Sequence, residues 1–116
     1  MGARLFKVLP VLFWTFGASA LGAPAPTLQI DQTILEAHAQ LIEAGWSPAP
    51  TQTPSTRERR WAGVTLKSLS SCSGSGVGFC RFDYQRESQR LSVVTVPSRP
   101  GTASIGRVER YWPSED

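Results

Sequence analysis

Two cysteines, Cys72 and Cys80, enclose a run of seven residues that contains three glycines. We call residues 73–79 the glycine loop. Two adjacent antiparallel strands joined by a turn of this size bring their ends within disulfide distance, and glycines adopt positive φ angles at little steric cost. In the chain-entropy description, closing so short a loop stabilises a domain by about 2–3 kcal/mol. The spacing therefore predicts a structural disulfide between Cys72 and Cys80.

The N-terminal segment has the pattern of a secretory signal peptide. Arg4 and Lys7 precede an apolar run of about ten residues, and Ala18-Ser19-Ala20 forms a small-residue cleavage triplet. The run is shorter than the ~20 residues of a membrane-spanning helix, and the alternative is an uncleaved anchor. We expect cleavage after Ala20 and export to the periplasm or the extracellular space, where disulfides persist.

Removal of residues 1–20 leaves one small domain with a nearly balanced charge. Because Arg4 and Lys7 leave with the signal peptide, ten Lys and Arg remain against nine Asp and Glu, and the net charge falls from +3 to +1. This balance argues little for a nucleic-acid partner. We expect residues 21–30 to form a flexible, proline-rich lead and residues 31–116 to form a single domain without a membrane span.

Residues 31–44 have the pattern of an amphipathic helix. Asp31 suits the N-cap position, while Gly45 suits a left-handed helix end and Pro48 prevents continuation. We expect Trp46 to fold back onto the core. The apolar face of this helix is predicted to contain Ile34, Leu35, His38, Leu41 and Ile42.

The rest of the chain has loop and strand patterns. Residues 47–58 contain three prolines and few apolar residues, which indicates a loop. From Trp61 onward the period approaches two, and strands are expected near 64–66, 80–84, 91–96 and 105–112. The expected fold is α+β, with one N-terminal amphipathic helix packed on an antiparallel meander of three or four strands and one disulfide. In the second strand, alternation predicts a buried face of Cys80, Phe82 and Tyr84 and an opposite face of Arg81, Asp83 and Gln85.

The glycine loop does not fit the nucleotide-binding, zinc or redox motifs that its glycines and cysteines suggest. Its Gly-x-Gly-x-Gly spacing is not a dinucleotide fingerprint, and no Gly-Lys-Ser/Thr follows to make a phosphate-binding loop. Two cysteines and the distant His38 fall short of the four ligands of a zinc site, and a redox pair would more usually be Cys-x-x-Cys. We therefore predict no catalytic, cofactor-binding or metal-ligating residue. The loop is either a stapled turn or an exposed recognition loop, whose candidate residues are Ser73, Gly74, Ser75, Gly76, Val77 and Gly78.

A basic cluster and a lone histidine are the other candidates. Arg57, Arg59 and Arg60 precede Trp61 and form a candidate basic patch for anionic lipid, polysaccharide or nucleic acid, or else a solvated strand edge. His38 is the single histidine, so any Ser-His-Asp scheme would need it. Its place on the apolar helix face favours a partly buried core histidine.

Four segments carry a resemblance to known proteins: Gly45-Trp46-Ser47-Pro48, the Cys72 to Cys80 segment, Leu91 to Thr95, and Val108 to Trp112. With the signal peptide, they resemble a group of small exported bacterial proteins, common in cyanobacteria, that share a Cys-Ser-Gly-x-Gly-x-Gly-Phe-Cys segment and whose function is uncharacterised. Where that group often has a glycine after the Val-Val-Thr strand, this chain has Val96-Pro97. The resemblance implies export and fold, and it implies no activity. The order of a helix and a meander is also similar to small periplasmic modules of the PepSY and β-lactamase-inhibitor-like kind, in layout alone.

Three functional hypotheses follow. The first is a non-catalytic binding module that recognises a protein or envelope component through the glycine loop. The second is a small hydrolase or thiol-redox enzyme that acts through His38 or the cysteines. The third is a structural or membrane-surface role through Arg57, Arg59 and Arg60.

Overall fold

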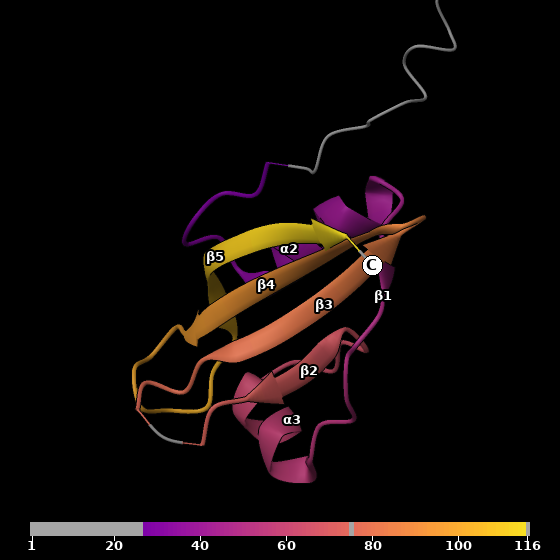
Figure 1. Ribbon diagram of the computed structural model, residues 1–116. Helices are drawn as coiled ribbons and strands as arrows, with labels where there is room; N and C mark the ends of the chain where they lie inside the picture. The colour runs from indigo at the N-terminus through magenta and orange to yellow at the C-terminus, as the bar shows by residue number, and fades with distance from the viewer. Residues whose placement is uncertain (1–26, 75, 116) are drawn as a thin grey trace, which may run out of the picture.

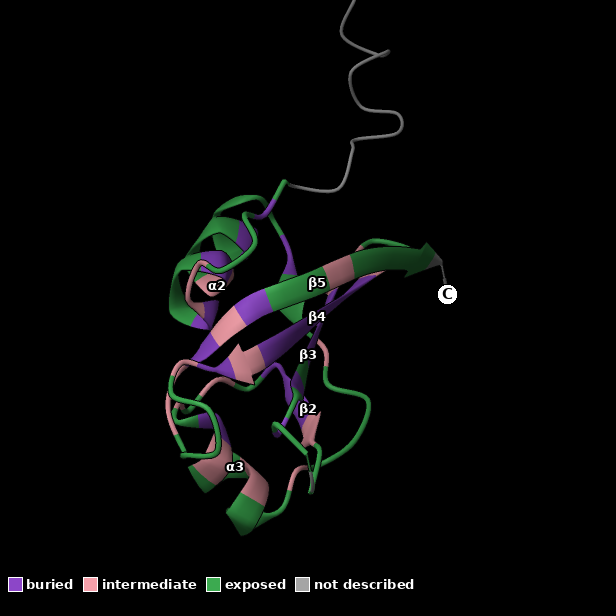
Figure 2. Ribbon diagram, turned by 90° about the vertical axis from the view of Figure 1, so that its left-hand side faces the viewer, coloured by how far each residue is buried: buried purple, intermediate pink, exposed green. Residues whose placement is uncertain are grey.

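The computed structural model describes residues 27–74 and 76–115, which form an antiparallel sheet with two helices on one side of it (Figures 1 and 2). The predicted α+β class is confirmed, but within this part of the chain there are two helices and five strands in place of one helix and three or four strands. The predicted signal peptide (1–20), most of the predicted lead and Ser75 lie outside the described residues. Among the described residues, Leu28 is the first that is buried, and its backbone N–H donates to the Tyr111 hydroxyl at 3.1 Å.

The central strand of the sheet is β3 (Cys80–Arg86). On one side it pairs with β4 (Gln89–Pro97), which pairs in turn with β5 (Gly106–Glu115), so these three strands form a meander. On its other side β3 pairs with β1 (Ser47–Pro48) toward its end and with β2 (Leu69–Cys72) at its start. All of these pairs are antiparallel.

Helix α2 (Ile34–Glu43) begins later than the sequence pattern predicted. Thr33 is its N-cap: the Thr33 hydroxyl accepts from the Glu36 backbone N–H at 3.1 Å, and the Glu36 carboxylate accepts from the Thr33 N–H at 3.0 Å. The prediction that Asp31 is the N-cap is therefore wrong. Asp31 has φ 79, and its N–H donates to the carbonyl of Val108 in β5, so this residue joins the chain to the sheet edge before the helix starts.

The buried face of α2 is narrower than predicted. Leu35 and Ile42 are exposed at 44% and 43%, which corrects the prediction that they face the core. Successive residues of a helix point about 100° apart. Leu35 and Ile42 each follow a buried residue directly, so their side chains point away from the sheet. Gly45 adopts φ +93, as expected for a left-handed residue after the helix, and Trp46 is buried in the core as predicted. The buried residues of α2 are Ile34, Ala37 and Leu41.

A second helix, α3 (Thr56–Ala62), replaces the end of the predicted loop and the predicted strand start at Trp61. Its N-cap is Ser55, whose hydroxyl accepts from the Glu58 N–H at 3.1 Å while the Glu58 carboxylate accepts from the Ser55 N–H at 2.7 Å. Gly63, with φ +70, ends the helix. The predicted strand near 64–66 is wrong as well, because the chain stays irregular until β2 begins.

The hydrophobic core lies between the two helices and one face of the sheet. Phe82 and Tyr84 of β3 are fully buried there, as their shared parity predicted. Figure 2 shows α2 and α3 on the same side of the strands. The other members of this cluster include Ile34, Leu41, Trp46, Ala62, Leu69, Leu91, Val93 and Val108.

Candidate functional site

Cys72 and Cys80 are directly paired across β2 and β3 and form the predicted disulfide, with their Cα atoms 4.0 Å apart. The glycine loop joins them, and the Ser73 N–H closes its base by donating to the Phe79 carbonyl at 2.6 Å. Gly76 and Gly78 have φ +68 and +83, which confirms at two positions the expected use of left-handed backbone.

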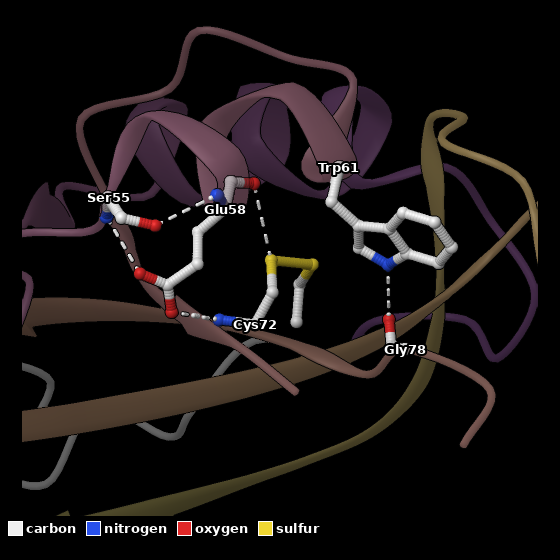
Figure 3. The surroundings of a disulfide bond; sticks show 6 residues. Ser55, Glu58, Trp61, Cys72 and Gly78 are labelled. Carbon is white, nitrogen blue, oxygen red and sulfur yellow. Dashed lines mark hydrogen bonds between the residues drawn. A yellow bond between two sulfur atoms is a disulfide. The ribbon is translucent and has the colours of Figure 1, made fainter. Parts of the chain in front are cut away.

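Glu58 joins α3 to the disulfide-bearing end of β2. One carboxylate oxygen accepts from the Ser55 N–H, and the other accepts from the Cys72 N–H at 2.9 Å (Figure 3). The backbone hydrogen bonds with Ser55 and then with Cys72 lower the pKa of Glu58 below its usual 4.5. Glu58 is therefore ionised near neutral pH and serves as a fixed acceptor between the two segments.

Trp61 joins the other end of α3 to the glycine loop. Its indole Nε1–H donates to the Gly78 carbonyl at 2.9 Å, and the ring is half-buried. Figure 3 shows the disulfide lying between the Glu58 carboxylate and the Trp61 indole. The helix and the loop are thus connected on both sides of the disulfide.

A groove of about 350 Å³ lies between α3 and the glycine loop. Two loop residues outside this lining, Val77 and Phe79, are exposed at 45% and 39%, and Phe79 lines a separate hollow with Arg81 and Val94. One positive and one negative side chain, a half-buried indole and backbone amides of the loop are the groups that this surface offers a ligand. We call it the loop groove; it is lined by Arg57, Glu58, Trp61, Cys72, Ser73, Gly74, Gly76 and Gly78.

The predicted basic patch is divided by α3. Arg57 lines the loop groove, whereas Arg59 and Arg60 line a second concavity of about 610 Å³ on the other side of the helix. This division arises because the three arginines lie on a helix, where consecutive positions point in different directions, and not on a strand edge. We call the second concavity the basic cleft; the residues that define it here are Pro54, Arg59, Arg60, Val64, Leu66 and Lys67.

His38 is half-buried on α2, and its Nδ1 lies 2.8 Å from the Tyr84 hydroxyl. Ser68 donates to the same hydroxyl at 2.9 Å, which leaves the Tyr84 proton to be donated to a neutral His38. Burial lowers the pKa of His38 from 6.5 and raises the pKa of Tyr84 to about 12. These three side chains form a neutral hydrogen-bonded chain beside the core.

Asp83 was predicted on the less buried face of β3, but it is 1% exposed. Its carboxylate accepts from the Ser70 hydroxyl of β2 at 2.5 Å and from the Ser92 hydroxyl of β4 at 2.6 Å. Arg81 adds an ion pair at 3.1 Å. Donors from three strands therefore satisfy this carboxylate. The alternation of residues along β3 could not predict its burial, because two of these donors lie on other strands.

Other chemistry is limited in the described ranges. Residues 27–74 and 76–115 contain no group of three or more His, Cys, Asp or Glu side chains placed to hold a metal ion. Neither described helix has the length and apolar character needed to cross a membrane.

Comparison with known proteins adds no family assignment. No protein-family model, curated protein or solved structure matches the chain. The resemblance to small exported bacterial proteins therefore stays a prediction, and the function has to be argued from the site itself.

Proposed function

We propose that the chain is an exported, non-catalytic binding domain that holds a segment of a partner protein of the cell envelope or extracellular space in the loop groove. The observation that carries this proposal is that α3 and the glycine loop, the two walls of the groove, are joined by hydrogen bonds on both sides of the disulfide. Export is supported by the Cys72–Cys80 disulfide, because disulfides persist in oxidising compartments.

The first support is pre-organisation. The disulfide fixes the ends of the glycine loop, the Glu58–Cys72 hydrogen bond fixes the start of α3, and the Trp61–Gly78 hydrogen bond fixes its end. A loop that is already ordered loses less conformational entropy when it binds than a free loop does. These links therefore favour recognition by the groove over a purely structural turn.

The second support is the side-chain chemistry of the groove and its loop. Trp61 lines the groove and is only half-buried, and Val77 exposes an apolar side chain on the same glycine loop. Aromatic and apolar anchors surrounded by polar groups are typical of the energetically important centre of a protein interface. Arg57 and Glu58 supply charges of both signs at the edge, which suits a polar peptide segment.

The test is capture of a partner by the full chain, expressed with its own N-terminal segment and recovered from the exported fraction. Its measured mass also shows whether the chain starts at Leu21. Wild type, Val77→Ser and Ile42→Ser are each used against a detergent extract of the source cell envelope. Ile42 is the matched control because its exposure, 43%, is close to the 45% of Val77, and it lies on α2 rather than on the glycine loop.

We expect one partner to be captured by wild type and Ile42→Ser and lost with Val77→Ser. Titration calorimetry with the purified partner then measures the affinity of each variant. Equal capture by Val77→Ser and wild type contradicts the proposed site. Capture of no protein by wild type contradicts a protein partner.

A further inference from the structure

The basic cleft lies on the side of α3 opposite the loop groove. Residues of the proline-rich segment before the helix, the helix itself and the turn before β2 line it together. Its volume of about 610 Å³ is within the range of ~300–1,000 Å³ found for small-molecule sites. The lining belongs to segments that the sequence pattern had assigned to a loop and a strand.

Three cations surround this cleft: Arg59, Arg60 and Lys67. Within the described residues, none of them forms an ion pair, and no Asp or Glu lines the cleft. The neighbouring carboxylate of Glu58 accepts from the backbone amides of Ser55 and Cys72 and interacts electrostatically with Arg59, but it lines the loop groove and not this cleft. The cleft therefore has a net positive potential that an anion would neutralise.

Apolar side chains form another part of the lining. Val64 and Leu66 are half-buried, as is Pro54. Each of these side chains exposes part of its surface to water in the open cleft. Covering that apolar surface with a ligand would contribute about 25 cal/mol of favourable binding free energy per Å². A free inorganic anion would leave this apolar surface uncovered, and an uncharged hydrocarbon would leave the cations unpaired.

We propose that the basic cleft binds a small amphipathic anion. The anionic head, a carboxylate or a phosphate monoester, lies between Arg59, Arg60 and Lys67, and the short hydrocarbon body covers Val64 and Leu66. Guanidinium groups bind such heads through paired, charge-assisted hydrogen bonds. This site is separate from the loop groove and does not depend on the proposed protein partner.

The test is titration calorimetry of the full chain with monomeric decanoate and decyl phosphate. Decanol and inorganic phosphate are the controls for the hydrocarbon body and for the anionic head. The key variant is the double substitution Arg59→Gln with Arg60→Gln, and Arg57→Gln is its matched control on the loop-groove side of the same helix. Val64→Ser tests the apolar part, and thermal unfolding checks that each variant is folded.

We expect decanoate or decyl phosphate to bind more tightly than either control. Each lost arginine contact should weaken binding by about tenfold, while Arg57→Gln binds as wild type does. Val64→Ser should weaken binding of the amphipath and leave its dependence on salt unchanged.

Four outcomes overturn the proposal: no binding of either probe, equal binding of decanol, equal binding of inorganic phosphate, or the same affinity in the double arginine variant. Binding to anionic vesicles without binding to the monomeric probes also overturns it and favours a membrane-surface role. Because Val77→Ser leaves the cleft intact, failure of the protein-partner test leaves this result unaffected.

Discussion

The carboxylate of Glu58 accepts a hydrogen bond of 2.9 Å from the backbone N–H of Cys72. The same carboxylate caps α3 through Ser55, so one side chain both completes the helix start and attaches the helix to the disulfide-bearing strand. A helix of seven residues has little stability of its own, and such tertiary attachments supply most of it. One charged group therefore links the start of this groove wall to the disulfide-bearing strand, in addition to the Trp61–Gly78 hydrogen bond at its other end.

Replacement of Glu58 by Gln should lower the free energy of unfolding near neutral pH by about 1 kcal/mol, because a charge-assisted hydrogen bond becomes a neutral one at a partly exposed site. Glu36→Gln is the matched control, since Glu36 forms the same capping box in α2 but bonds only to its own cap residue, Thr33, in the described structure. Urea denaturation measures both. A loss with Glu36→Gln as large as with Glu58→Gln would contradict a special role for the Cys72 contact.

The contribution of Glu58 should depend on pH. Its pKa is lowered in the folded protein, so the stability that it supplies is present above the unfolded value of 4.5 and is lost as pH falls through the folded pKa. We expect the difference in unfolding free energy between wild type and Glu58→Gln to shrink as pH falls below 4.5. A difference that stays constant over this range would show that the carboxylate titrates normally.

Gly78→Ala should destabilise the protein more than Gly76→Ala. Both glycines have positive φ, which costs an alanine about 1 kcal/mol. A Cβ at Gly78 would also overlap the Trp61 indole, whereas a Cβ at Gly76 would meet nothing within 4 Å. We expect losses of about 2–4 kcal/mol for Gly78→Ala against about 1 kcal/mol for Gly76→Ala, measured by thermal unfolding. Equal losses would mean that the loop moves away from Trp61 at little cost.

Asp83→Ala should be among the most destabilising polar substitutions in this chain. It leaves the hydroxyls of Ser70 and Ser92 without their acceptor in a buried site. We expect a loss of about 3 kcal/mol, compared with about 1 kcal/mol for Ser92→Ala, which removes a single donor. Urea denaturation of the two variants gives the comparison. A loss below that of Ser92→Ala would show that the buried carboxylate is itself unfavourable and is only tolerated.

His38 should titrate below its usual value. Burial lowers its pKa, so the stability that depends on the neutral imidazole is present above about pH 6.5 and is lost as pH falls through the folded pKa. His38 is the single histidine in the sequence, so its ring resonances in an NMR titration are assigned without ambiguity. Between about pH 7.5 and about pH 5.5, the unfolding temperature of His38→Gln should fall less than that of wild type. An NMR titration midpoint at or above 6.5 would contradict the effect of burial.

Several features could be predicted from the sequence because their signals are local. The disulfide follows from two cysteines at hairpin spacing, and α2 follows from apolar periodicity and Gly45. The start of α3 also has a local signal, Ser55-Thr56-Arg57-Glu58, which is a capping box. Three prolines just before it pointed to a loop, and the box was missed for that reason. Two local signals compete in this segment, the prolines and the capping box, and in the structure the capping box starts a helix.

The sequence by itself determined the elements whose stability comes from neighbours along the chain: the left-handed end after α2, the alternation that buries Phe82 and Tyr84, and the closure of the glycine loop. Only the tertiary structure decided which polar groups meet. Asp83 is buried because β2 and β4 bring it hydroxyl donors, and Arg57 is separated from Arg59 and Arg60 because α3 presents them to different grooves. Such contacts depend on strand register and helix placement. These arise from packing over the whole domain and leave no periodic pattern in any one segment.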